Sequence, residues 1–417
     1  MSVPSPATTL HLGIFFDGTG NHLGNASNGD ASNIAKLFAV YPHDSAGHHL
    51  SVYVEGIGTR EAQPDSLFAM GTGMGHLGWR AAVERAQQGI AQRLQMWIEQ
   101  HPGQTIGSLR LDVFGFSRGA ACARHLANDV WAGIDGLTYA LLRANPLIAA
   151  ALPTPQAPRT TLRFLGLFDT VTAIKGTGTL PQLTLPASPP CGVVHLVAAD
   201  ELRHNFPLSS AGTHDLQLPG AHADIGGGYP PSMEEVLLLT RPDSSRVPIR
   251  LALERTPSYQ RTQALLQAQS HTLTEYGYTC RVRSWQKEHR SNVRGDRSHD
   301  VEVYAAVEGR RQVRNDLARV YLEIMHHLAL AGGVCLQPLP DFAYAAELLP
   351  VIEKIKAKAY GQRRDIDLDA AQRTLLYRRY IHRSGHWTTE GFSQNSDLDT
   401  LFVHRPEPSG KRRILLA

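Results

Sequence analysis

The sequence predicts an α/β fold in which a mostly parallel sheet is covered by helices. In the first 240 residues, short apolar runs alternate with segments whose apolar residues recur at helical spacing. Gly-rich turns follow several of these runs, as in FFDGTGN, which ends the first of them. Such alternation is typical of parallel strands joined by crossover helices.

Each expected strand is a mostly apolar run of five to nine residues. The strands are predicted, in chain order, at LHLGIFF (10–16), HLSVYVE (49–55), LRLDVFGF (109–116), TLRFLGLF (161–168), CGVVHLVAA (191–199) and DLQLP (215–219). The two clearest helices are predicted at 79–101, which ends before Pro102, and at 118–134.

After residue 240 the sequence changes character, and the helical spacing predominates. Helices are predicted at 246–270, 309–332 and 344–361. We therefore expect three parts in this chain: an α/β core over 1–240, a helical insertion or cap over 241–375, and a C-terminal segment over 376–417 that returns to the core.

Composition narrows the class of protein. The chain has 417 residues, of which 42% are hydrophobic and 19% charged, as in an ordinary globular protein. A net charge of +3 is too small to indicate a nucleic-acid partner. The four cysteines form no CxxC pair and no HExxH motif occurs, so neither a metal nor another cofactor is expected.

The N-terminal sequence MSVPSPATTLHLGIFF lacks a basic segment followed by a long apolar one, so no Sec signal peptide is predicted. No apolar stretch reaches the length of a membrane span. We expect the protein to be made and folded in the cytoplasm.

One serine stands at the junction between a predicted strand and a predicted helix. Ser117 is the centre of GFSRG, a G-x-S-x-G motif flanked by Gly115 and Gly119. In the nucleophile elbow of α/β-hydrolases, such a serine lies on a tight turn, and the glycines let strand and helix approach closely. The following helix directs its first N–H groups at a developing oxyanion. The sequence therefore predicts a serine nucleophile in an α/β-hydrolase-like fold.

A serine hydrolase also needs an acid and a base, which in this fold follow the serine in the order Asp, His. Asp169 ends the strand after the serine, although a turn or helix-capping aspartate would look the same. His222 follows another apolar run and precedes three glycines. His382 and His386 are alternatives for the base, since the base of such folds commonly follows the last strand.

The loop after the first strand is a candidate for part of the oxyanion hole. Asp17 and Gly18 follow the apolar run 10–16. The N–H of Gly18 is predicted to act beside the N–H of Arg118 in binding the oxyanion. Asp17 is equally well explained as a turn residue, or as a residue whose side chain binds a loop or an ion.

Five motifs in the same order resemble a known family. FFDGTGN, GFSRGA, FDTV, ADELRHNFPL and GAHADIGGGY are similar to segments of the type VI secretion lipase effectors, antibacterial phospholipases with an α/β-hydrolase catalytic domain. The resemblance covers roughly residues 10–240. It implies that Ser117 is the nucleophile, Asp169 the acid and His222 the base of a phospholipase A, with Asp224 and His382 as possible supporting residues. Ala221 stands where the family commonly has valine.

The resemblance also implies partners and a place of action. Members of the family act on membrane phospholipids, travel with a secretion spike or adaptor protein, and are neutralised by an immunity protein. The expected route is from the producer's cytoplasm, without a Sec signal, to the membrane or periplasm of a target bacterium. A cytoplasmic hydrolase fits the missing signal equally well. The alternatives are an esterase of small soluble esters and a non-catalytic delivery or binding module.

Two further patterns are weaker. Residues 281–300 are rich in arginine and contain one tryptophan. This composition suits contact with anionic lipid headgroups, but a solvated, salt-bridged loop is the preferred interpretation. The G-x-G-x-x-G at 73–78 does not follow a strand-like run, so a dinucleotide site is rejected.

Overall fold

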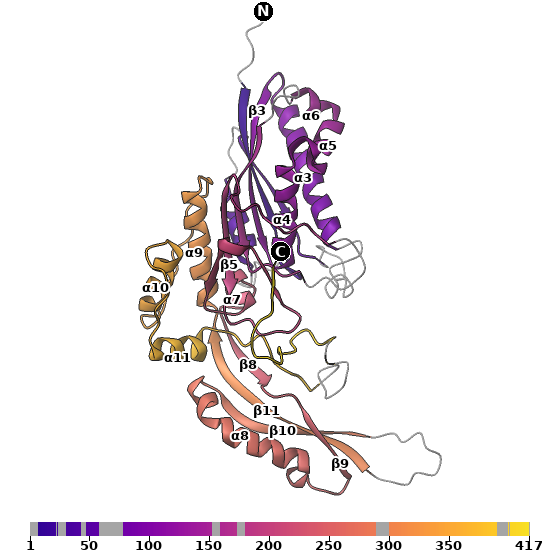
Figure 1. Cartoon of the computed structure of the whole chain (residues 1–417), viewed down its shortest axis with the longest axis vertical. Coiled ribbons are helices and arrows are strands. Elements are labelled where there is room, and N and C mark those ends of the chain that lie inside the picture. Colours follow the sequence, from indigo (N-terminus) through magenta and orange to yellow (C-terminus); the bar gives the residue numbers. More distant parts are fainter. Residues whose placement is uncertain are drawn as a thin grey trace, which may run out of the picture.

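A computed structural model gives the fold of the protein (Figure 1). It describes residues 7–21, 23, 31–42, 47–57, 78–151, 159–172, 180–288, 300–389, 399 and 401–416. Most of the G-x-G-x-x-G segment at 73–78 and residues 289–299 of the arginine-rich stretch lie outside these ranges.

A six-stranded parallel sheet forms the centre of the fold, in the order β2-β1-β3-β4-β5-β7. Its strands are β1 (Ala7–Phe16), β2 (His49–Val54), β3 (Thr105–Phe116), β4 (Arg159–Phe168), β5 (Gly192–Ala198) and β7 (Asp215–Leu218). All six were expected from the sequence, and the predicted parallel α/β architecture is confirmed.

Helices cover both faces of this sheet (Figure 1). The helices on one face are α3 (Trp79–Gln100), α4 (Arg118–Trp131), α5 (Leu137–Ala144) and α6 (Pro146–Ala151). Those on the other are α1 (Asn33–Ala39), α9 (Asp316–Ala331), α10 (Leu349–Ala359) and α11 (Ala370–Arg379), together with the short α7 (His222–Gly226).

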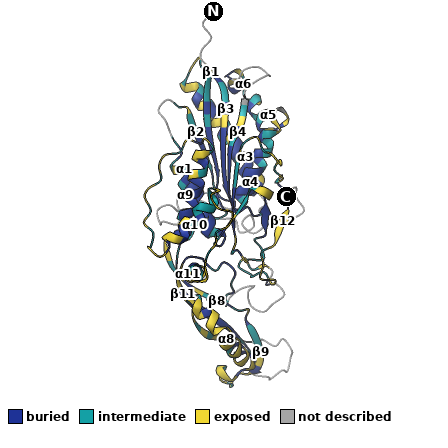
Figure 2. Cartoon of the chain, turned by 60° about the vertical axis from the view of Figure 1, so that its left-hand side comes forward, coloured by how far each residue is buried: buried dark blue, intermediate teal, exposed yellow. Residues whose placement is uncertain are grey.

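The side chains of β1 show why both faces had to be covered. Leu12 and Ile14 point into the core beneath α3 and α4, whereas Phe15 packs into the core beneath α1 and α9. Alternate residues of a strand face opposite sides of its sheet, so a strand with apolar side chains on both faces needs two cores. Figure 2 shows the resulting buried strands between helices with exposed outer surfaces.

A second, antiparallel sheet extends from one end of the central sheet (Figure 1). It consists of β8 (Ser232–Leu238), β9 (Asp243–Pro248), β10 (Thr279–Glu288) and β11 (Asp300–Arg314). Helix α8 (Pro257–Glu275) packs against β9, β10 and β11. The prediction that 241–375 is a helical insertion is therefore wrong in part, because three of these strands lie within it. The domain boundaries at 240 and 375 stay predictions.

The physical reason lies in the side chains of β10. Arg281 and Arg283 occupy alternate positions of this strand, and both form ion pairs with Glu308 on β11. An antiparallel sheet tolerates charges on one face while α8 buries the other. This half of the arginine-rich stretch is thus a salt-bridged strand.

The remaining elements are short, and one pair of them attaches the C-terminal segment. They are β6 (Leu208–Ser210), β12 (Ile414–Leu416) and the 3₁₀ turns η2 (Gly133–Asp135), η3 (Gly212–His214) and η4 (Leu253–Arg255). Strand β12 pairs in parallel with β6. Among the described helices, none is both long enough and apolar enough to span a membrane.

Candidate active site

Ser117 lies on the tight turn between β3 and α4, as the sequence predicts. Its φ of 58° and ψ of −126° lie in a region that side-chain-bearing residues rarely adopt. The flanking glycines are required by packing: a Cβ on Gly115 would lie 2.6 Å from Cα of Ala120, and a Cβ on Gly119 would collide with the carbonyl oxygens of Phe16 and Asp17. The turn is therefore held tightly between the sheet and the loop after β1.

The serine hydroxyl is not used to cap its own helix. Ser117 is the N-cap residue of α4, but its side chain accepts no hydrogen bond from the helix. The first N–H groups of a helix have no partner within it, and Arg118 and Gly119 are the first two residues of α4.

Asp169 directly follows β4 and also has a positive φ, 43°. Its Oδ1 accepts the backbone N–H of Ala198 at 2.9 Å, and its own N–H donates to the carbonyl of Leu196 at 2.8 Å. Neighbouring strand β5 thus fixes both the backbone and the side chain of this fully buried aspartate.

His222 is the first residue of α7, and its Nδ1 donates to Oδ2 of Asp169 at 2.5 Å. The imidazole lies between two aromatic rings, with centroids 4.7 Å from that of Phe116 and 5.1 Å from that of Phe206. Ser117 lies beside the same aspartate, because its N–H donates to the carbonyl of Phe168 at 3.0 Å. The structure gives no hydrogen bond between the described residues Ser117 and His222; in substrate-free hydrolases this contact is often open.

Electrostatics favour a charged aspartate and a neutral histidine. Burial alone would raise the pKa of Asp169, but the charge of Arg412 and the hydrogen bond from His222 hold that pKa well below its usual range. Burial lowers the pKa of His222 below its ordinary 6.5, and the nearby Asp169 opposes this only in part. His222 is therefore suited to accept a proton at neutral pH.

Glu201 and Arg203 are neighbours of His222 that the sequence analysis did not single out. The backbone N–H of His222 donates to Oε2 of Glu201 at 3.3 Å. Arg203 pairs with the same carboxylate at 2.9 Å, and Ser384 donates to its other oxygen at 2.9 Å. A buried carboxylate thus fixes the start of α7, and ADELRHNFPL contained the signal for it.

The loop after β1 lies beside the elbow, but one of its predicted roles is not supported. The N–H of Gly18 donates to Oδ1 of Asp17 at 2.6 Å and so already has a partner. The side chain of Asp17 also accepts hydrogen bonds from the hydroxyl groups of Ser32 and Tyr53. This aspartate therefore fixes the conformation of the loop. The hydroxyl of Thr19 is buried and has no hydrogen-bond partner among the residues that the structure describes.

The two C-terminal histidines lie apart from Asp169. Nδ1 of His382 donates to Oδ1 of Asp224 at 2.6 Å, and its ring stacks on that of Tyr229 with centroids 3.8 Å apart. His386 stacks on His404, with centroids 4.4 Å apart. The structure thus pairs His222 with Asp169 and gives His382 a different acid. The described residues contain no cluster of three or more His, Cys, Asp and Glu that could hold a metal ion.

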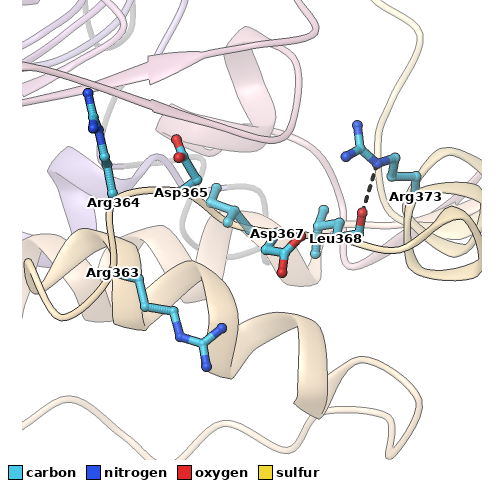
Figure 3. A pocket seen from close by; sticks show the side chains of 7 residues that line it. Arg363, Arg364, Asp365, Asp367, Leu368 and Arg373 are labelled. Carbon is cyan, nitrogen blue, oxygen red and sulfur yellow. Dashed lines mark hydrogen bonds between the residues drawn. The ribbon is translucent and has the colours of Figure 1, made fainter.

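A surface hollow of about 640 Å³ lies away from these residues, where α10 leads into α11 (Figure 3). Its lining is mostly exposed and consists of Arg363, Arg364, Asp365, Ile366, Asp367, Leu368 and Arg373. None of the candidate nucleophile, acid and base residues lines it.

A strained serine between a central parallel strand and its helix, with an Asp–His pair at the same edge of the sheet, defines the α/β-hydrolase-like class. Within this class, residues 11–132 match the family model for the catalytic domain of Tle1-like phospholipase effectors of the type VI secretion system. The resemblance to type VI secretion lipase effectors that the five motifs indicate is confirmed.

Comparison with solved structures extends this similarity beyond the catalytic domain. The chain is similar over 99% of its length to the structure described as the Tle1 effector bound to the VgrG spike from the type 6 secretion system. That match has 28% sequence identity, covers 95% of that chain and has a TM-score of 0.76. An uncharacterized protein from Pseudomonas aeruginosa matches at 22% identity, over 54% of this chain and 42% of that one, with a TM-score of only 0.33. No curated protein matches the chain.

Proposed function

We propose that this protein is a serine phospholipase A that cleaves acyl esters of membrane phospholipids. The observation that carries the proposal is the hydrogen bond from His222 to Asp169 beside the strained Ser117. The similarity to Tle1-like phospholipase effectors supports lipid esters as the substrate class.

The proposed reaction begins when Ser117 Oγ attacks the acyl carbonyl carbon and passes its proton to Nε2 of His222. Nδ1–H of His222 donates to Asp169, which leaves Nε2 as the accepting nitrogen of the neutral ring. The imidazolium then gives its proton to the departing lysophospholipid oxygen. A water, deprotonated by the same histidine, cleaves the acyl-enzyme and releases a fatty acid.

The developing oxyanion needs hydrogen-bond donors on the side of the loop after β1. The N–H of Arg118, in the first turn of α4, remains the first candidate. Since the N–H of Gly18 donates to Asp17, Thr19 replaces Gly18 as the second candidate donor.

We further propose that the protein is an antibacterial effector that travels with a type VI spike and acts at the membrane or periplasm of a target cell. The matched structure is a Tle1 effector bound to a VgrG spike, which supports a spike partner here. An immunity protein in the producer follows from an antibacterial role.

The test measures fatty acid release from phosphatidylethanolamine–phosphatidylglycerol liposomes by wild type and by Ser117→Ala. Release by wild type alone is expected, and mass spectrometry of the lysolipid then identifies the acyl position. No release by a wild type whose Ser117 still reacts with a fluorophosphonate probe would favour an esterase of small soluble esters. A protein that neither releases fatty acid nor reacts with the probe would be a non-catalytic module.

A further inference from the structure

The carboxylate of Asp169 is held by an arginine from the far end of the chain. Nη1 of Arg412 donates to Oδ1 at 2.6 Å, and Nη2 donates to Oδ2 at 2.8 Å. Oδ2 is the same oxygen that accepts Nδ1–H of His222. The guanidinium therefore contacts both carboxylate oxygens, one of which carries the hydrogen bond to the imidazole.

Arg412 reaches this position because the C-terminal segment is attached to the chain between β5 and β7. The N–H of Glu407 donates to the carbonyl of Leu202 at 2.7 Å, and the N–H of Leu208 donates to the carbonyl of Arg413 at 2.9 Å. The pairing of β12 with β6 continues this attachment. Nε of Arg412 also donates to the carbonyl of Phe206 at 2.9 Å, so the guanidinium plane is fixed independently of Asp169.

We propose that Arg412 is a positioning residue of the hydrolase reaction, which fixes the plane of the Asp169 carboxylate and compensates its charge, so that His222 stays oriented and neutral. This inference rests on the proposed serine hydrolase function. A bidentate guanidinium allows one orientation of a carboxylate, whereas a single donor allows several.

The compensation of charge matters because the pair is buried. The side chains of Asp169 and Arg412 are 0% and 7% exposed, respectively. Without Arg412, the buried negative charge of Asp169 would stabilise the protonated form of His222 more strongly. A protonated ring cannot act as the base. The charged groups that face His222 are Asp169 after β4, Glu201 and Arg203 after β5, and Arg412 through the shared aspartate.

Arg413, the next residue, provides a matched control. Its side chain is 49% exposed, pairs with Glu407 at 3.2 Å and donates to the carbonyl of His204 at 2.6 Å. It therefore helps to attach the same segment without touching Asp169 or His222. Arg412 and Arg413 both attach this segment, but only Arg412 contacts Asp169.

The experiment measures the rate at which a fluorophosphonate probe labels full-length protein between pH 5 and 9, for wild type, Arg412→Met, Arg412→Lys and Arg413→Gln. Thermal unfolding of each variant checks its fold. For Arg412→Met we expect labelling at neutral pH to fall by roughly 10- to 100-fold, since the aspartate and imidazole lose their alignment. We also expect the acidic limb of the rate profile to move up by about one pH unit, because Asp169 then stabilises the imidazolium more strongly.

Arg412→Lys keeps the charge and loses the bidentate geometry. We expect the acidic limb of its rate profile at the same pH as in wild type, and a lower maximal rate of labelling. This variant tests the proposal even if Arg412→Met does not fold. Arg413→Gln is expected to match wild type. Wild-type rates in Arg412→Lys, an unshifted acidic limb in folded Arg412→Met, or an equal loss in Arg413→Gln would overturn the positioning role. Absence of labelling in wild type would instead overturn the proposed hydrolase function itself.

Discussion

Ser117 and Asp169 are neighbours across two adjacent strands, and they are the two non-glycine residues with a positive φ in the described part of the chain. The N–H of Ser117 donates to the carbonyl of Phe168, and the N–H of Val171 donates to the carbonyl of Ser117 at 3.3 Å. Backbone strain of this kind persists only where the surroundings enforce it, and it concentrates at functional sites. The two strained residues therefore lie at one edge of the sheet, where we propose that the reaction takes place.

The strain at Ser117 predicts that a glycine at this position removes activity but raises the stability of the fold. On the proposed mechanism, Ser117→Gly and Ser117→Ala should both lack lipid hydrolysis, but only glycine adopts a φ of 58° without strain. Relief of the backbone strain stabilises Ser117→Gly, whereas the larger entropy of glycine in the unfolded chain destabilises it. We expect the balance to make the free energy of unfolding of Ser117→Gly about 1 kcal/mol higher than that of Ser117→Ala. Chemical denaturation of both variants measures this difference. Equal stability would mean that the turn is not strained.

The close approach of the elbow to the loop after β1 predicts that Gly119 cannot carry a side chain. In Gly119→Ala the new Cβ would collide with the backbone oxygens of Phe16 and Asp17. Backbone atoms cannot avoid such a collision by a change of side-chain rotamer. We expect a loss of about 1–3 kcal/mol in the free energy of unfolding and a large loss of probe labelling.

Gly385→Ala is the control, since its Cβ would meet its nearest neighbours, in Leu202 and Pro406, at an ordinary 3.5 Å. Denaturation curves and labelling rates of the two variants are compared with those of wild type. A stable and fully reactive Gly119→Ala would show that this loop can move away from the elbow.

The parts of the site that follow local rules could be predicted from the sequence. Apolar runs of strand length and a glycine on each side of Ser117 are signals within a few residues, and they placed the sheet and the elbow. The pairing of Asp169 with His222 follows from chain order, because the ends of parallel strands meet at one edge.

The rest depended on contacts that no local pattern encodes. Arg412 lies 243 residues from Asp169 in sequence and reaches it only because β12 joins β6. Gly18 was expected to offer its N–H to the oxyanion, but the neighbouring Asp17 side chain accepts that N–H in the structure. The strand β10 was not expected, because Arg281 and Arg283 resemble a solvated loop until Glu308 is placed opposite them.

The pair of His382 and Asp224 predicts a structural rather than a chemical role for the C-terminal histidine. Both side chains are fully buried, and Asp224 also accepts the N–H groups of His382 and Ala221. We expect His382→Ala to lower the free energy of unfolding by about 1–3 kcal/mol, because a buried carboxylate loses a donor. The folded fraction should keep the pH profile of probe labelling. If His382 were the base, its removal would abolish labelling in folded protein.

Buried histidines predict how stability depends on pH. Burial lowers the pKa of His195, His222 and His404 from the ordinary 6.5, in the case of His404 to about 4. A group whose pKa is lower in the folded state binds its proton first in the unfolded chain as the pH falls. These histidines therefore contribute stability that is fully present above pH 6.5 and is lost as the pH falls toward 4.

Two carboxylates extend this loss to lower pH. Burial opposes the ionised form of Glu201, but Arg203 outweighs it and lowers the pKa of Glu201 to about 2, and the pKa of Asp169 lies below its usual range. Their contribution is present above about pH 4 and disappears below it. We expect the midpoint of thermal unfolding to fall steadily from pH 6.5 to 4 and further below pH 4. His404→Gln, which removes one titrating group, should make the slope between pH 6.5 and 4 shallower, whereas a midpoint that rises on acidification would contradict the assignment of neutral buried histidines.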